Sequence, residues 1–412
     1  ANLRDYFANL WAKNPNPSLF EHKTHEKVTN ILNQADFLTT KYHIVVANPP
    51  YMGSKGMNAR LSAWAKKNYP NSKSDLFAMF IERGLELVIK CGYSAMITMQ
   101  SWMFLTSYEK LRKKLLLNSS IISLAHMENM VMGIAFGTSA TILTKYKNSD
   151  KLGAYCHIEY SDLENNSPKK FPPLNTRNNS RNTKDNLFWV TSKDFQKIPG
   201  SPIGYWITNE MRNIFSYGKS MKDYATPRQG LATGKNDKFL RFWYEVSSHK
   251  SNLNFINKNN SMYATIKWFP CNKGGEFRRW YGNNLYVVNW ENDGYEIKNF
   301  RDSNGKLRSR PQNENYYFKE GITWSTMSSS SLSMRYSAPG FLFETKGSVC
   351  FPNEGNSWEI ALALMNTKIV KYLLLILSPT LDFHEGPIGK VPVIESDKEE
   401  VKKIARECTN IS

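Results

Sequence analysis

The sequence predicts an α/β protein, in which an open sheet with interleaved helices is followed by a second, mixed and β-rich domain. Two observations support this prediction. In residues 31–150, short runs of β-branched apolar residues, typical of buried parallel strands, alternate with segments whose apolar residues recur at helical spacing. From about residue 189 the chain is rich in aromatic residues, glycine and asparagine, with short alternating runs that favour a β domain.

The expected elements of the first domain follow from these periods. The run His43–Asn48 is the clearest strand. Residues 75–90 carry apolar side chains on one helical face, and Gly92 is a helix-ending signal. The remaining elements are a strand at 93–99, a basic amphipathic helix at 108–117, and strands at 121–127 and 139–146.

At 412 residues the chain is too long for one ordinary domain. The first domain is expected at 1–160. Residues 161–190 are polar, rich in asparagine and proline, and lack an apolar period, as in a linker or long surface loop. The second domain is expected at 191–395, with its best helix at 358–377, and a charged, helical tail at 396–412.

The net charge of +18 points to a polyanionic partner. Residues 1–150 hold 18 basic and 10 acidic side chains, so the excess is not confined to one domain. Basic charge spread over two domains suits a nucleic acid lying across both, because each neutralised phosphate releases counterions. A merely soluble basic surface is the alternative.

Several classes of protein are disfavoured. The five cysteines lie far apart without a CxxC pair, so we expect neither a disulfide framework nor a metal site. No stretch approaches the ~20 apolar residues of a membrane span. The N-terminus lacks a signal-peptide layout. We therefore expect a cytoplasmic protein without a membrane partner.

Directly after the strand at 43–48 comes Asn48-Pro49-Pro50-Tyr51, which resembles the catalytic motif of the amino-methyltransferases. Their substrate nitrogen is a poor nucleophile, because its lone pair is conjugated. Acceptors on its two protons, the Asn48 side-chain carbonyl and the Pro49 backbone carbonyl, would activate it. Pro49 and Pro50 fix the backbone, and Tyr51 offers a stacking face for an extruded base. An ordinary turn is the alternative, but the end of a strand favours a site.

Three flanking segments strengthen the resemblance. Residues 34–38 resemble the element that holds the adenine of the methyl donor, which implies that Asp36 accepts from its amino group and Phe37 packs on its ring. A turn-capping aspartate is the alternative. The segment 74–80 implies that Phe80 approaches the same adenine, and 133–139 implies that Phe136 is a second wall for the flipped base. Core packing is the rival role for both phenylalanines.

The longer string Asn48–Asn58 resembles the adenine methyltransferases of the BREX phage-defence systems and, through them, the fused restriction–modification enzymes of type IIG. This resemblance implies the C-terminal part of a Rossmann-like class I methyltransferase sheet, followed by a target-recognition domain. It implies N6 methylation of adenine in double-stranded DNA with S-adenosylmethionine as donor, for host-genome marking. Other defence-system proteins are candidate partners. We find no nuclease motif.

One family element has no match in the sequence. The glycine-rich loop that holds the methionine part of the donor does not occur before Asp36. The chain therefore looks like the C-terminal part of a larger protein, and we expect the fragment alone to be inactive.

In the second domain, basic residues alternate with tryptophan and tyrosine in segments that resemble target-recognition domains. Such side chains can neutralise phosphates or reach base edges. Most of the aromatic residues are expected in the core. The residues expected to contact DNA are Lys55, Lys235, Lys238, Lys273, Arg278 and Arg279.

Three functions compete. A DNA adenine methyltransferase is favoured, because Asn48 opens the motif and cytosine enzymes more often place serine there. Methylation of protein glutamine uses the same motif, but those enzymes lack a large basic second domain. The main alternative is a DNA-specificity module whose catalytic domain is incomplete and inactive.

Overall fold

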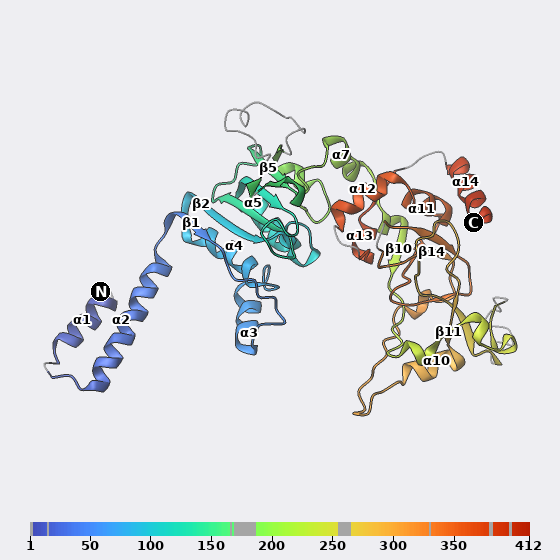
Figure 1. Ribbon diagram of the computed structural model, residues 1–412, viewed down its shortest axis with the longest axis horizontal. Coiled ribbons are helices and arrows are strands. Elements are labelled where there is room, and N and C mark those ends of the chain that lie inside the picture. Colours follow the sequence, from blue (N-terminus) through green and yellow to red (C-terminus); the bar gives the residue numbers. More distant parts are fainter. Residues whose placement is uncertain are drawn as a thin grey trace. The chain divides into compact units, whose positions relative to one another are not determined.

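The computed structural model describes residues 3–14, 16–164, 167–168, 187–253, 265–328, 331–378, 382–394 and 398–412. The chain forms two compact units, Ala1–Gln196 and Lys197–Ser412 (Figure 1). Most of the expected linker at 161–190 lies outside the described residues, but its last four residues begin a strand of the first unit.

The first unit contains a six-stranded mixed sheet in the order β1-β2-β4-β3-β5-β8. Strands β1, β2, β3 and β5 are parallel, whereas β4 and β8 run antiparallel to their neighbours. The carboxyl ends of the four parallel strands therefore share one edge of the sheet with the start of β4. The bounds are β1 Tyr42–Ala47, β2 Val88–Met99, β3 Ser120–Met127, β4 Thr138–Thr144, β5 Leu152–Ile158 and β8 Leu187–Thr191.

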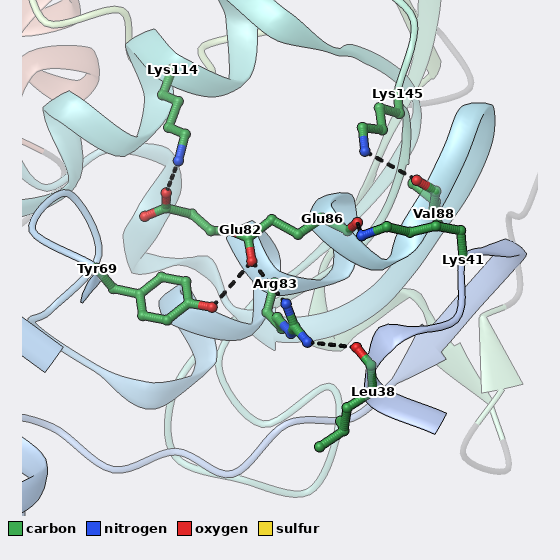
Figure 2. A network of polar contacts seen from close by, with 9 residues as sticks. All are labelled: Leu38, Lys41, Tyr69, Glu82, Arg83, Glu86, Val88, Lys114 and Lys145. Carbon is green, nitrogen blue, oxygen red and sulfur yellow. Dashed lines mark hydrogen bonds and ion pairs between the residues drawn. The ribbon is translucent and has the colours of Figure 1, made fainter. Parts of the chain in front are cut away.

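Helix α4 (Leu76–Leu87) packs on β1 and β2, and its buried side chains include Phe77 and Ile81. Helix α5 (Glu109–Asn118) packs against β3, and its buried side chains include Leu111 and Leu115. Buried Glu82 of α4 accepts a hydrogen bond from Ser72. Glu82 also pairs with Lys114 of α5, which holds the two helices together (Figure 2). The other helices of this unit are α1 (Leu3–Ala12), α2 (Leu19–Thr39), α3 (Ala59–Asn68) and α6 (Ser192–Gln196).

The expected helix at 75–90 was too long at its C-terminus. Helix α4 ends at Leu87 and β2 already begins at Val88, so Gly92 lies inside the strand and does not cap the helix. A Cβ at Gly92 would lie 2.9 Å from the carbonyl oxygen of His43 on β1. Gly92 thus permits a close approach of two strands. Glycine is favoured at such a position as it is at the end of a helix, so the residue type alone does not distinguish the two roles.

The second unit is built on two four-stranded sheets and confirms the expected mixed, β-rich character. One has the order β10-β17-β14-β15 and the other β11-β13-β12-β16. One apolar cluster contains Trp324 of the first sheet and a second contains Phe269 of the other sheet. The bounds are β10 Ala225–Arg228, β17 Val349–Pro352, β14 Gly321–Trp324, β15 Met334–Ser337, β11 Leu240–Phe242, β13 Tyr286–Asn289, β12 Trp268–Asn272 and β16 Leu342–Phe343.

The expected helix at 358–377 is two helices, α11 (Trp358–Met365) and α12 (Lys368–Leu377). The break arises because the Asn366 side chain bonds both backbone groups of Met334, at 2.9 and 3.0 Å, and Thr367 then caps α12. Within the described residues, no single helix is long and apolar enough to cross a membrane. Among the described helices, only α11 and α12 taken together have that length and composition, and their axes are bent by 75° at the break between them.

The expected helical tail forms α14 (Lys398–Ile411), while residues 396 and 397 lie outside the described part. Arg406 of α14 pairs with Glu359 of α11 at 2.6 Å. The remaining helices of this unit are α7 (Asn209–Tyr217), α8 (Met221–Tyr224), α9 (Asn236–Phe239), α10 (Glu291–Lys298) and α13 (Glu385–Gly389).

Candidate active site

The motif Asn48-Pro49-Pro50-Tyr51 follows β1 at the edge where the parallel strands end. Asn48 and Pro50 are exposed, Pro49 is buried and Tyr51 is half-buried. Asn48 lines a cavity of about 620 Å³. Asn48 is therefore accessible to a ligand, whereas the proline that follows it is covered by protein.

Tyr51 lies among aromatic rings. It meets Phe77 of α4 edge to face, with ring centroids 6.0 Å apart, and Phe136 in the same manner at 5.6 Å and 72°. Burial raises the pKa of Tyr51, so its hydroxyl is neutral at ordinary pH. The structure thus brings together the two rings that the sequence suggested as walls for a base.

The segment after Tyr51 is fastened to the start of α4 by Asp75, which caps that helix. One carboxylate oxygen of Asp75 accepts from the backbone N–H of Met52 at 3.0 Å and from that of Phe77 at 3.3 Å. The N–H of Leu76 donates to the carbonyl of Met52 at 3.1 Å. Asp75 is buried, which raises its pKa, and these hydrogen bonds oppose the rise.

From the sequence, Asp75 was predicted only as the first residue of a helix. The available signal was an aspartate directly before an apolar helical run, which is a strong N-cap pattern. Nothing in that pattern indicates that the same carboxylate also orients the residue after Tyr51, because Met52 is distant along the chain.

The loop that carries Phe136 is held by the end of β2. The N–H of Gln100 donates to the carbonyl of Gly137 at 3.0 Å, and the Gln100 side chain hydrogen-bonds His126 of β3. Burial lowers the pKa of His126 to about 3, so His126 is neutral. Since the Gln100 atom in this contact is its side-chain carbonyl oxygen, the neutral ring carries its proton on Nε2 and donates it to Gln100.

The His126 ring stacks on His157 of β5, with centroids 5.1 Å apart. His157 lies 3.4 Å from Glu128 and 3.9 Å from Glu159. The sequence predicts no metal site. In the structure, however, the potential ligand atoms of Glu128, His157 and Glu159 lie within 4.8 Å of one another. Spacing along the sequence did not reveal this grouping, because two different strands supply it.

The residues expected at the donor lie on α2 and α4. Asp36 is on the last turn of α2 and pairs with Arg4 of α1 at 2.6 Å, and Phe37 is 71% exposed. Phe80 is partly exposed on α4. Within the described residues, no hydrogen bond or ring contact joins these three side chains to Asn48 or Tyr51.

The end of α2 is nevertheless tied to α4. Arg83 of α4 donates to the carbonyl of Leu38 at 2.9 Å, and Lys41 donates to the carbonyl of Glu86 at 2.7 Å (Figure 2). Phe80 precedes Arg83 by three residues and so shares its face of the helix. Phe37 and Phe80 therefore lie on elements that contact each other directly.

The residues expected to contact DNA reach the surface. Lys55 follows Gly53 in a tight turn closed by Gly56, and Lys235 precedes α9. Lys238 lies 3.5 Å from Glu296 and therefore has an acidic partner. Lys273 packs over the ring of Tyr286, whereas Arg278 and Arg279 are exposed on the loop 273–283.

Comparisons with known proteins show what this chain resembles. Residues 2–131 match the family model of the Eco57I restriction-modification methylase. Over 385 residues the chain is 40% identical to the adenine-specific methyltransferase BrxX of Escherichia coli O9:H4 (strain HS), covering 92% of this chain and 30% of that protein. The similarity is to a segment of that protein. It is also 35% identical over 393 residues to the adenine-specific methyltransferase PglX of Lacticaseibacillus casei (strain Zhang), covering 94% and 32%.

The chain therefore spans about a third of the length of its BrxX and PglX relatives. The solved structure of the type IIL restriction-modification enzyme MmeI in complex with DNA is also similar. Its TM-score is 0.52 at 13% identity, over 88% of this chain and 48% of that chain. This likeness concerns the fold and confirms the expected α/β class with an additional domain.

Proposed function

We propose that this chain provides the catalytic and DNA-reading parts of a site-specific DNA adenine N6 methyltransferase that marks host DNA in phage defence. The proposal depends on two observations within one motif. Asn48 is exposed and lines a cavity, and Tyr51, three residues further on, contacts the ring of Phe136. Similarity to methyltransferases named adenine-specific supports the choice of base. The basic charge of +18 supports DNA as the partner.

The chemistry follows from hydrogen-bond acceptors placed before the substrate arrives. S-adenosylmethionine would supply an electrophilic methyl group. The Asn48 side-chain carbonyl and the Pro49 backbone carbonyl accept from the two amino protons of the extruded adenine, which increases electron density on N6. The two prolines hold the second acceptor rigid, so little reorganisation is needed. Tyr51 and Phe136 position the base.

The proposed donor residues are Asp36, Phe37 and Phe80, and the sheet suggests that they need a covering segment. Ile44 and Val46 of β1 are 62% and 75% exposed, and the cavity beside Asn48 is lined mainly by apolar side chains of β1 to β5. Parallel sheets are normally covered on both faces. We therefore propose that donor binding requires polypeptide beyond this chain and that the chain alone is inactive.

The uncovered sheet face also favours a second candidate function, a DNA-specificity module without catalysis. The two are separated by assaying the full-length protein for methyl transfer to unmethylated genomic DNA, with N6-methyladenosine measured by mass spectrometry. Asn48→Ala should lower the rate by at least about 100-fold and leave DNA affinity unchanged. The exposed helix residue Asn30 provides the matched control, Asn30→Ala.

Equal rates for Asn48→Ala and Asn30→Ala would refute the catalytic role of the motif. If the wild-type full-length protein binds DNA and forms no N6-methyladenosine, the specificity module is the correct function.

A further inference from the structure

Arg335 of β15 is a buried cation with poor compensation. Its side chain is 1% exposed. One guanidinium nitrogen lies 3.5 Å from the carbonyl of Arg278 and another lies 3.5 Å from the hydroxyl of Ser325, both at the outer limit of hydrogen bonding. Its Nε has no partner, and within the described residues no carboxylate pairs with it.

Arg112 of α5 shows what a compensated buried arginine looks like in the same protein. It is 2% exposed, but it donates to the carbonyls of Trp102 and Leu105 at 2.9 and 2.7 Å. Burial lowers the pKa of both Arg112 and Arg335 to about 10, but nearby Glu109 opposes the shift at Arg112. At Arg335, the positive charge of Arg278 adds to the effect of burial. Burying an uncompensated charge is costly, so Arg335 calls for a ligand of opposite sign.

The loop 273–283 passes directly over Arg335. It is fixed on the edge strand β15, because the N–H of Trp280 donates to the carbonyl of Met334 at 3.0 Å and the N–H of Tyr336 donates to the carbonyl of Trp280 at 2.7 Å. The Ser325 hydroxyl also donates to the carbonyl of Gly275 at 2.9 Å. The loop therefore has a defined shape, and its left-handed residues are Gly274, Gly275, Trp280, Gly282 and Asn283.

The outer surface of this loop carries two basic and two aromatic side chains, together with one exposed acidic side chain, that of Glu276. Arg278 and Arg279 are exposed, as are Phe277 and Tyr281. The buried positive charge of Arg335 therefore lies beneath a rigid loop that carries the exposed Arg278. A phosphate group bound by Arg278 would offset the positive charge that Arg278 adds to the surroundings of Arg335, and an Arg–phosphate contact is strong and directional.

We propose that Arg278 and Arg335 form an anion site for a backbone phosphate of DNA, with Arg278 as the contact and Arg335 as the positioning residue beneath it. This inference rests on the proposed function, in which the second unit reads DNA. Arg335 acts through the Arg278 carbonyl and through its own charge, since it is itself covered. Its buried charge is retained at a cost to the stability of the free protein.

Thermal unfolding of the whole chain tests this site with inorganic phosphate as the probe, compared with sodium chloride at equal ionic strength. Phosphate should raise the Tm of the wild type, and this shift should vanish in Arg335→Met and Arg278→Met. In chloride, Arg335→Met should unfold at the wild-type Tm or higher, because it removes an uncompensated charge. The control Arg112→Met should unfold at a lower Tm, because its well-bonded partners lose their donor.

A purely structural role predicts the opposite pattern. If Arg335→Met lowers the Tm in chloride as Arg112→Met does and keeps the phosphate shift, the proposal is wrong. Absence of a phosphate shift in the wild type also overturns it.

The affinity for duplex DNA, measured over a range of salt, separates this site from the function on which it rests. Arg278→Met and Arg335→Met should each reduce the log–log salt slope by about 1. An unchanged slope with intact DNA binding would refute the site and leave the proposed function standing. A phosphate shift that depends on Arg335, in a full-length protein that does not bind DNA, would support an anion site at this position but refute both DNA as its ligand and the proposed function.

Discussion

The rings of Tyr51 and Phe136 meet edge to face, with centroids 5.6 Å apart and planes at 72°. Tyr51 follows β1, and Phe136 precedes β4, two strands that are separated in the sheet by β2. They meet because β4 runs antiparallel, so that its start lies at the same edge as the end of β1. The reversal of a single strand therefore places an aromatic wall beside the motif.

The proposed stacking role of Tyr51 predicts different results for two substitutions in the full-length protein. Tyr51→Phe keeps the ring and should retain most methylation, since the hydroxyl is neutral and burial only raises its pKa. Tyr51→Ala should lower the rate by roughly 10- to 100-fold, the range expected for one lost base–aromatic stack. Fluorescence of 2-aminopurine at the target position reports base extrusion. Equal rates for the two variants would show that the ring does not hold the base.

Asp75 is predicted to position the motif without touching substrate. Asp75→Ala leaves the N–H groups of Met52 and Phe77 without their acceptor, and loss of the cap should cost about 1 kcal/mol of stability. We expect slower methylation with little change in KM for DNA, and partial rescue by Asp75→Asn. A control cap at the start of α3, Asn58→Ala, should lose similar stability and keep the rate. Equal rates for Asp75→Ala and the wild type would contradict the positioning role.

The lowered pKa of His126 should make the stability of the protein depend on pH. Its folded pKa is about 3, below the ordinary value of 6.5, so between these values the unfolded chain binds a proton that the folded chain does not. Stability should therefore fall as the pH drops below 6.5, by at most about 1.4 kcal/mol per pH unit. Urea unfolding at pH 7 and 5 should show a weaker dependence in His126→Gln. The exposed His43 serves as control in His43→Gln, which should keep the wild-type dependence.

The close packing of the backbone around Gly230 in the second unit leaves no room for a side chain at this position. A Cβ at this position would lie 1.9 Å from the carbonyl oxygen of Phe343 and 2.7 Å from the nitrogen of Glu344, both backbone atoms. Gly230→Ala should lower the free energy of unfolding by about 3 kcal/mol or more, among the larger single-residue effects. Gly386→Ala meets nothing within 4 Å and should be close to neutral. Circular dichroism during urea unfolding distinguishes the two, and equal stabilities would refute the close approach.

The sequence by itself determined the features that depend on local pattern. The run of β-branched residues specified β1, and the tetrapeptide after it specified where acceptors and an aromatic ring could act. The net charge of +18 indicated a basic protein, and the aromatic second half of the chain indicated a second, β-rich domain. Such signals are readable because strand period, turn chemistry and composition involve neighbouring residues only.

Only the tertiary structure decided which distant residues meet. The strand order placed Phe136 beside Tyr51, and the start of α4 gave Asp75 a second task at Met52. The same long-range pairing turned Gly92 from an expected helix stop into a point of close strand approach. Burial of Arg335 was equally unreadable, because whether a charge is covered or paired depends on segments far away in the sequence.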